Sequence, residues 1–189
     1  MNDLIRNSIK ELQQAITVSE LNYEIWWVYK AKESRKRYED ILYKYPIFFK
    51  MSLHAHFVAM LVSLYRLYET RTDTINLPQL MKLIKDEGSI PQQELKLIEK
   101  DIFNLKPLWN KVSVLRNNLF AHRSKSLDPS SIWKQAQVTP IQFKKIINES
   151  KSILNRITSL RNRSSHAFNL SSTKDILNLL NDLKRFNKK

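Results

Sequence analysis

The residue types able to carry chemistry are few in this sequence. Cysteine is absent, which excludes disulfides, thiolate catalysis and cysteine-ligated zinc, so any reaction must use histidine, arginine, carboxylates or hydroxyls. Of the four histidines, His54 and His56 lie two positions apart on a predicted helix. Their side chains therefore point about 200° apart, which prevents them from sharing a metal ion. We interpret both as core or helix-edge residues.

The motifs of several hydrolase classes are also missing. The sequence has no HExxH, no dense cluster of carboxylates and no glycine-rich phosphate loop, which argues against metallohydrolases and P-loop enzymes. We therefore expect neither a metal nor a cofactor. What remains is arginine together with histidine. In VSVLRNNLFAHR, Arg116 precedes His122 by six positions, and Asn117 directly follows the arginine.

The helical geometry of this stretch sets a condition on its use as a site. Residues six apart on a straight α-helix lie about 240° round the axis and roughly 9 Å along it. Arg116 and His122 can therefore meet only if the helix ends before the histidine, or if the site closes across two subunits. Otherwise Arg116 is a surface charge, and His122 is a C-terminal helix residue stabilised by the helix dipole.

Basic residues are concentrated in the second half of the chain. Lysine and arginine number 32 against 18 acids, a formal excess of +14. From Arg116 to His166 there are ten basic residues and two acids, whereas Arg66 to Asp101 has six basic and seven acidic residues. Such an excess favours a polyanionic partner, RNA above all, although a solvated surface that keeps the protein soluble has the same composition.

The elements that position these residues are predicted to be helices. A single glycine and six prolines leave few of the positive-φ positions that hairpins and small barrels need. We predict one all-α domain over 1–189, a bundle of about six to seven helices with one long central pair and a basic, frayed tail at 184–189. Hydrophobic spacing and caps predict helices at about 2–17, 19–45, 46–69, 78–86, 91–122 (kinked or split at Pro107), 139–160 and 173–186.

The sequence indicates a cytoplasmic protein. Its first residues, MNDLIRNSIKEL, lack the basic and then apolar layout of a signal peptide. We find no apolar run near the roughly 20 residues that a membrane span needs, because the longest one, Phe57 to Tyr65, is bounded by His56 and Arg66.

The Arg116 stretch resembles the signature of the HEPN superfamily: an arginine, a polar residue, a few further residues and a histidine near a helix end. Within that superfamily, YRLYETRTDTINLPQLMKLI followed at a distance by LRNNLFAHR is similar to the AbiU-type abortive-infection branch. The likeness extends from the helix that carries Trp26 and Trp27 to the basic helix after Thr139.

The resemblance implies a bundle that dimerises into a composite active site, and a metal-independent endoribonuclease that leaves 2′,3′-cyclic phosphate ends. His122 would be the general acid or base, Arg116 would hold the scissile phosphate, and Asn117 would orient either one. The biological role would be phage defence, or that of a toxin with an antitoxin protein as a further partner.

The basic second half supplies the candidate RNA contacts: Asn118, Arg123, Lys125, Arg156, Arg161 and Arg163. SLRNRSSH also places Arg161 and Asn162 before His166, and we interpret it as a chance match or an RNA-facing fringe. Two alternatives stay open. One is a non-catalytic HEPN-like module that binds RNA, nucleotide or protein, and the other is a purely structural dimerisation bundle.

Overall fold

The described part of the chain is built from helices. The structure is a computed structural model that describes residues 2–118 and 134–187, and all regular structure in these ranges is helical. The all-α prediction is therefore confirmed. The main helices are α1 (Asn2–Lys30), α2 (Lys32–Arg37), α3 (Glu39–Lys44), α4 (Pro46–Tyr68), α5 (Leu77–Glu87), α6 (Gln92–Arg116), α8 (Pro140–Asn162) and α9 (Thr173–Phe186).

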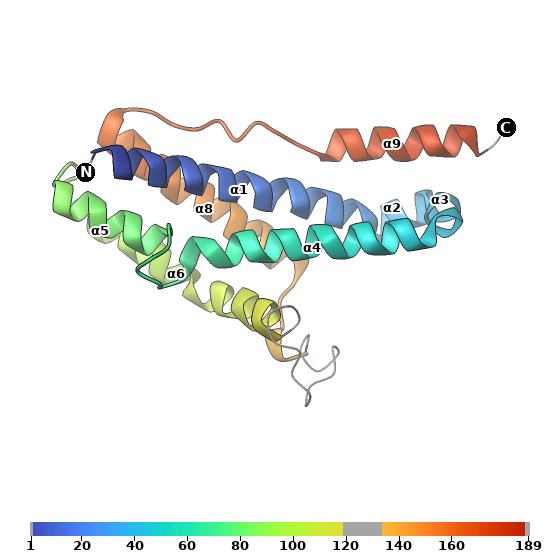
Figure 1. Cartoon of the computed structure of the whole chain (residues 1–189), viewed down its shortest axis with the longest axis horizontal. Coiled ribbons are helices and arrows are strands. Elements are labelled where there is room, and N and C mark those ends of the chain that lie inside the picture. Colours follow the sequence, from blue (N-terminus) through green and yellow to red (C-terminus); the bar gives the residue numbers. More distant parts are fainter. Residues whose placement is uncertain (1, 119–133, 188–189) are drawn as a thin grey trace.

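Helices α1 and α4 share the most extensive contact and form the central pair of the bundle (Figure 1). Helix α8 packs on α1 and on α6, and α6 also packs on α4, so the four helices enclose one core. Its fully buried side chains include Ile5, Leu12, Ile16, Met60, Leu61, Leu64, Ile98, Leu115, Phe143, Ile147 and Leu154. The broad apolar face predicted for 46–69 is this inner side of α4.

The predicted boundary between a first and a second helix is wrong. Helix α1 continues without interruption to Lys30, and within it the hydroxyl of Ser19 donates a hydrogen bond back to the carbonyl of Ala15 (2.8 Å). The break comes instead at Ala31, whose backbone is extended (φ −62°, ψ 134°). The rest of the segment predicted as one helix forms the two short helices α2 and α3.

Pro107 does not split α6, which runs on to Arg116. A proline within a helix removes one N–H donor and leaves the carbonyl of the residue four positions earlier without its helical partner. That residue is Phe103, whose side chain is 69% exposed. It lies on the solvent side of α6, where water can bind the free carbonyl.

The predicted caps of α8 and α5 are confirmed. Thr139 and Gln142 form a capping box, with Thr139 Oγ1 accepting from the Gln142 amide (3.3 Å) and Gln142 Oε1 accepting from the Thr139 amide (3.1 Å). At the end of α5, Gly88 takes the left-handed conformation (φ 70°) that stops the helix.

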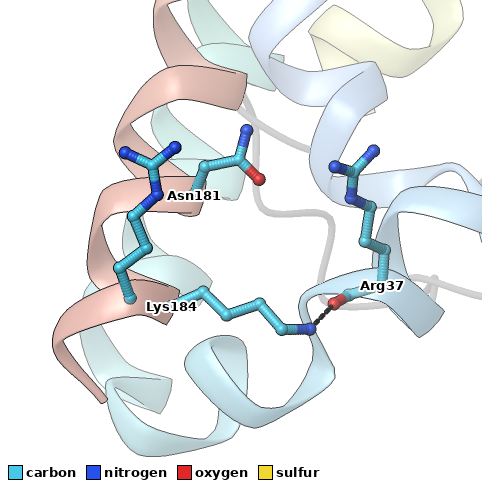
Figure 2. Close-up of a pocket in the computed structure, with 4 residues that line it drawn as sticks. Arg37, Asn181 and Lys184 are labelled. Atoms are coloured by element: carbon cyan, nitrogen blue, oxygen red, sulfur yellow. Dashed lines mark hydrogen bonds between the residues drawn. The ribbon is translucent and has the colours of Figure 1, made fainter. Parts of the chain in front are cut away.

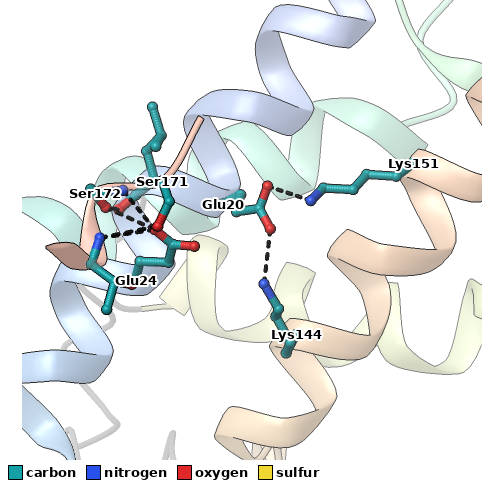
Figure 3. A network of polar contacts seen from close by, with 8 residues as sticks. Glu20, Glu24, Lys144, Lys151, Ser171 and Ser172 are labelled. Atoms are coloured by element: carbon teal, nitrogen blue, oxygen red, sulfur yellow. Dashed lines mark hydrogen bonds and ion pairs between the residues drawn. The ribbon is translucent and has the colours of Figure 1, made fainter. Parts of the chain in front are cut away.

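Two carboxylates of α1 attach the C-terminal part of the chain (Figure 3). The buried Glu20 pairs with Lys144 and Lys151 of α8. Glu24 accepts hydrogen bonds from Ser171, Ser172 and Thr173, where α9 begins. Burial alone would raise the pKa of Glu24, but these hydrogen bonds lower it below its usual value. Further along α9, Lys184 donates to the Arg37 carbonyl, which ties that helix to α2 (Figure 2).

Among the described residues, α4 is the one helix long and apolar enough to cross a membrane by length and composition. This corrects the sequence-based expectation that no such run exists. The inner side of α4 belongs to the bundle core, and its outer side is apolar as well: Ile47 and Met51 are 78% and 58% exposed.

Candidate active site at the end of helix α6

The Arg116 stretch lies where the regular α-helix ends. Helix α6 closes at Arg116, and a π-helical turn begins at Asn117. The Asn117 amide donates to the Ser113 and Val114 carbonyls, and the Asn118 side chain donates to the Val114 carbonyl (3.0 Å). These bonds satisfy carbonyls of the last turn. Wide π turns are frequent at functional sites, because they reorient the side chains that follow.

The Arg116 guanidinium is held by a ring and by an amide. Its central carbon lies 4.6 Å from the centroid of the Tyr65 ring, and its Nη1 donates to Asn117 Oδ1 at 2.9 Å. The Asn117 amide nitrogen in turn donates to Ser113 Oγ at 3.3 Å. Asn117 thus contacts Arg116, one of the two residues that it was predicted to orient, and its role stays a prediction.

Two aromatic side chains form the platform beneath Arg116. The rings of Tyr65 and Trp109 stack with centroids 5.6 Å apart and planes 27° apart. The Trp109 indole also donates to the Tyr65 carbonyl (3.1 Å), which fixes the tryptophan against α4. Because the platform joins α4 to α6, the position of Arg116 is set by the packing of two core helices.

Within the described ranges, no carboxylate forms an ion pair with Arg116. A guanidinium has five N–H donors in one plane, and stacking on a ring leaves its edge free for an anion. The arrangement can therefore bind a phosphate group through the remaining donors.

Comparison with known proteins decides the family. A family model described as AbiU2, of the HEPN group, matches residues 2–182. The chain belongs to the AbiU2 family of HEPN proteins. The resemblance that the Arg116 stretch and the helix order indicated is thus confirmed, together with the helical-bundle fold. No curated protein and no solved structure matches this AbiU2 chain.

Part of the predicted site of this AbiU2 protein falls outside the described residues. His122, Arg123 and Lys125 lie there, so the distance from Arg116 to His122 stays a prediction.

The predicted RNA contacts on α8 do not gather around Arg116. Arg156 pairs with Glu94 (2.7 Å) and Asp101 (3.3 Å). Arg161 donates two hydrogen bonds to Glu87 (2.7 and 2.8 Å), which lower the pKa of that carboxyl to about 2. Both arginines thus link α8 to α5 or to the first half of α6, and the structure gives them a role in packing.

The positions of these arginines follow from the antiparallel packing of α6 and α8. Near the end of α6, Lys111 donates to the Gln137 carbonyl (2.7 Å) and to Gln142 Oε1 (3.4 Å), at the start of α8. Arg161 lies nineteen residues after Gln142 on α8, about 28 Å along the helix axis. Arg156 and Arg161 are thus far along the bundle from the Arg116 site. Arg163 is exposed and ends α8 in the left-handed conformation (φ 54°).

The residues of the second arginine-histidine stretch, SLRNRSSH, form contacts within the fold. The Asn155 side chain accepts from the His166 amide (2.8 Å) and donates to the His166 carbonyl (3.0 Å). The His166 ring packs edge-on against Phe168, with centroids 4.5 Å apart. These contacts and the Glu87 pair of Arg161 agree with the interpretation of SLRNRSSH as a chance match.

Sequence reasoning missed the platform, although one signal was present. Trp109 precedes Arg116 by seven residues, two helical turns, and therefore lies on the same face of α6. No local spacing identifies Tyr65, because it lies on another helix.

His56 has the helix-edge role predicted for it: its Nδ1 is 2.7 Å from Asn22 Oδ1, and burial lowers its pKa. Within the described ranges, no group of three or more His, Asp or Glu side chains could hold a metal ion.

Proposed function

We propose that this AbiU2 protein is a metal-independent endoribonuclease with Arg116 and His122 as its catalytic pair. The observation that carries the proposal is the state of Arg116. Its guanidinium is fixed by Tyr65 and Asn117 but has no carboxylate partner in the described chain. Arg161, which has a role in packing, is by contrast paired with the carboxylate of Glu87. An arginine that is fixed and un-neutralised is suited to the anionic transition state of phosphodiester cleavage.

The chemistry assigns one step to each side chain. An imidazole titrates near neutrality, so His122 takes the proton from the ribose 2′-hydroxyl or supplies one to the leaving 5′-oxygen. The 2′-oxygen attacks the adjacent phosphorus, the bond to the 5′-oxygen breaks, and a 2′,3′-cyclic phosphate remains. Arg116 stabilises the charge that develops on the phosphate oxygens.

The apolar outer side of α4 supports a homodimer with a composite site. Ile47, Met51, Val58 and Val62 follow one another at spacings of four, seven and four residues, so they lie on one face of the helix. Ile47, Met51 and Val62 are 78%, 58% and 46% exposed. Tyr65, whose ring lies against the Arg116 guanidinium, is seven residues after Val58 on this same face. A second copy packed there would meet the first beside the two arginines.

The biological setting follows from the family. AbiU2 is an abortive-infection type of HEPN protein, so we propose a role in phage defence, in the cytoplasm, with cellular or phage RNA as the substrate. A toxic ribonuclease needs control while no phage is present. An antitoxin protein that covers the Arg116 end of α6 would provide it.

Cleavage of a mixed single-stranded RNA in EDTA tests the proposal. Wild type should release cyclic-phosphate ends, and Arg116→Ala and His122→Ala should each lower the rate by about 10²-fold or more. Arg71→Ala is the matched control, because Arg71 is exposed and paired with Asp73. Loss of RNA cleavage in this control as well, or cleavage that needs a divalent metal, would contradict the proposal. RNA binding without cleavage would instead favour the non-catalytic module.

Oligomeric state tests the dimer separately. Met51→Glu places a charge in the apolar face of α4 and should give a monomer in sedimentation analysis, with cleavage lost at the same time. Leu97→Glu is the control, since Leu97 is 42% exposed on α6 and away from that face. A wild type that is monomeric and still cleaves RNA would refute the composite site.

A further inference from the structure

The end of the bundle formed by α2, α3 and the start of α4 contains a cavity that the Arg116 site does not use. Its volume is about 670 Å³, within the usual range for ligand sites. We name it the α2 cavity. Figure 1 shows the helices that line it, α2, α3 and the start of α4, together at one end of the bundle. Its lining comes from the end of α1 and from all three of these helices.

The polar part of the lining is almost entirely cationic. Five basic side chains and one acid, Glu39, border the cavity; the cations are Lys30, Lys32, Arg35, Lys36 and Lys50. All five are exposed, and none forms an ion pair with a carboxylate of the described residues. Like charges held close together without counter-charges repel one another, so the cavity attracts an anion with several charges.

This end differs from the second half of the chain, where sequence composition placed the excess charge. On α8, Lys144, Lys151, Arg156 and Arg161 are all paired with carboxylates. In the described structure, un-neutralised charge is therefore dense around α2. There, Lys30, Lys32, Arg35 and Lys36 border a concave site.

The apolar part of the lining suits flat rings. Tyr29, Phe49 and Leu53 lie at the base, and Tyr43, which is 70% exposed, borders the opening. Cations beside an exposed aromatic ring are the features with which proteins bind single-stranded nucleic acid: phosphates pair with the cations and bases stack on the ring. A bilayer surface is flat, so it reaches the rim of a concave site but not its lining.

We propose that the α2 cavity binds a single-stranded segment of RNA, which it holds outside the cleaving pair. The proposal rests on the proposed function in one respect, that the substrate is RNA. Lys50 in the cavity and Tyr65 under Arg116 lie fifteen residues apart on α4, about 22 Å along the helix. A strand several nucleotides long would reach both sites. The cavity then strengthens the binding of long substrates and leaves the cleavage of a dinucleotide unchanged.

Binding of a fluorescein-labelled, unstructured 20-nucleotide RNA to the full-length protein tests this role. Fluorescence anisotropy is measured in the Arg116→Ala background, so that the probe stays intact. Lys32→Glu/Lys36→Glu reverses two charges four residues apart on α2. The matched control, Lys96→Glu/Lys100→Glu, makes the same change on two exposed lysines of α6.

The α2 pair should weaken binding at least tenfold at about 0.1 M salt. It should also lower the slope of log Kd against log salt by about 1.4, because each lost phosphate contact on a single strand contributes about 0.7. The α6 pair should change Kd less than twofold. Tyr43→Ala should weaken binding about tenfold, the loss of one stacked base, and Tyr43→Phe should not. Tyr43 is mostly exposed, so its loss should not unfold the protein.

The other outcomes overturn the proposal in distinguishable ways. Equal weakening by the α2 and α6 pairs means that RNA binding depends on net charge alone, and no change in either means that RNA binds elsewhere. If the α2 pair loses binding to phosphatidylserine vesicles while RNA binding is intact, the cavity end serves an anionic membrane. Failure of the proposed function has a separate signature, which is a wild type that binds RNA through the α2 cavity but cleaves no RNA.

Discussion

A buried hydroxyl pair between α4 and α8 gives a sharp stability prediction. The hydroxyl of Tyr68 lies 2.7 Å from Ser150 Oγ, and both residues are buried. Ser150 Oγ also lies 2.6 Å from the carbonyl of Ile146, which can only accept. Ser150 therefore gives its one proton to that carbonyl and accepts from Tyr68. Burial raises the pKa of Tyr68, so its hydroxyl stays protonated as the donor.

This direction of donation makes the two single substitutions unequal. Ser150→Ala leaves the Tyr68 hydroxyl buried without an acceptor, which costs about 1–3 kcal/mol. Tyr68→Phe removes one hydrogen bond but leaves Ser150 bonded to the Ile146 carbonyl, so the cost is about 0.5–1.5 kcal/mol. With both changes no unsatisfied hydroxyl remains. The double variant should therefore be about 1 kcal/mol more stable than the sum of the single effects implies.

Urea unfolding of the full-length protein, followed by circular dichroism, measures this coupling. A loss of 1 kcal/mol lowers Tm by about 2–4 °C in a chain of this size, so a thermal melt provides a second readout. Ser152→Ala is the control, because Ser152 is exposed on the same helix and should change stability by less than about 0.5 kcal/mol. Additive single effects, or a Tyr68→Phe variant less stable than Ser150→Ala, would refute the assigned direction of donation.

Three further predictions concern the platform, an ion pair and a turn. Tyr65→Leu removes the ring under Arg116 and should lower kcat for RNA cleavage about fivefold, equivalent to about 1 kcal/mol, whereas Tyr65→Phe should keep it. Glu87, with its pKa lowered to about 2 by Arg161, contributes stability above its unfolded pKa of about 4.3. The difference in unfolding free energy between wild type and Glu87→Gln should therefore shrink as pH falls from about 5 to 2. Gly88→Ala should cost about 1 kcal/mol in urea unfolding, since φ is 70° there.

The parts of the fold that depend on local chemistry could be predicted from the sequence. Thr139 with Gln142 marks the start of α8, and Gly88 marks the end of α5, because a cap involves residues only a few positions apart. The continuity of α1 through Ser19 could not be read in this way. Serine is compatible both with a helix end and with a helix interior in which its hydroxyl bonds back to the chain, and packing against α4 and α8 favours the second.

In the candidate site, too, local contacts could be predicted from the sequence and long-range contacts could not. The sequence identified Arg116 and Asn117, whose hydrogen bond joins neighbours in the chain. It did not identify Tyr65, which lies on another helix. It also counted the basic residues of the second half as an excess of positive charge, without the carboxylates that pair with several of them. The carboxylates that neutralise them come from far away: Glu94 is 62 positions from Arg156, and Glu20 is 124 positions from Lys144. Spacing along the chain carries no signal for such pairs.

The two arginine-histidine stretches show why neutralisation matters more than the motif itself. Both have an asparagine after the arginine, and both arginines are held by their surroundings. A phosphate that approaches Arg161 must displace Glu87, whose two hydrogen bonds already occupy one side of the guanidinium. A phosphate that approaches Arg116 meets a cation held by a neutral ring and a neutral amide. Among the described residues, neither neighbour of Arg116 cancels its charge, so of the two stretches the Arg116 stretch is the one that we propose binds an RNA phosphate.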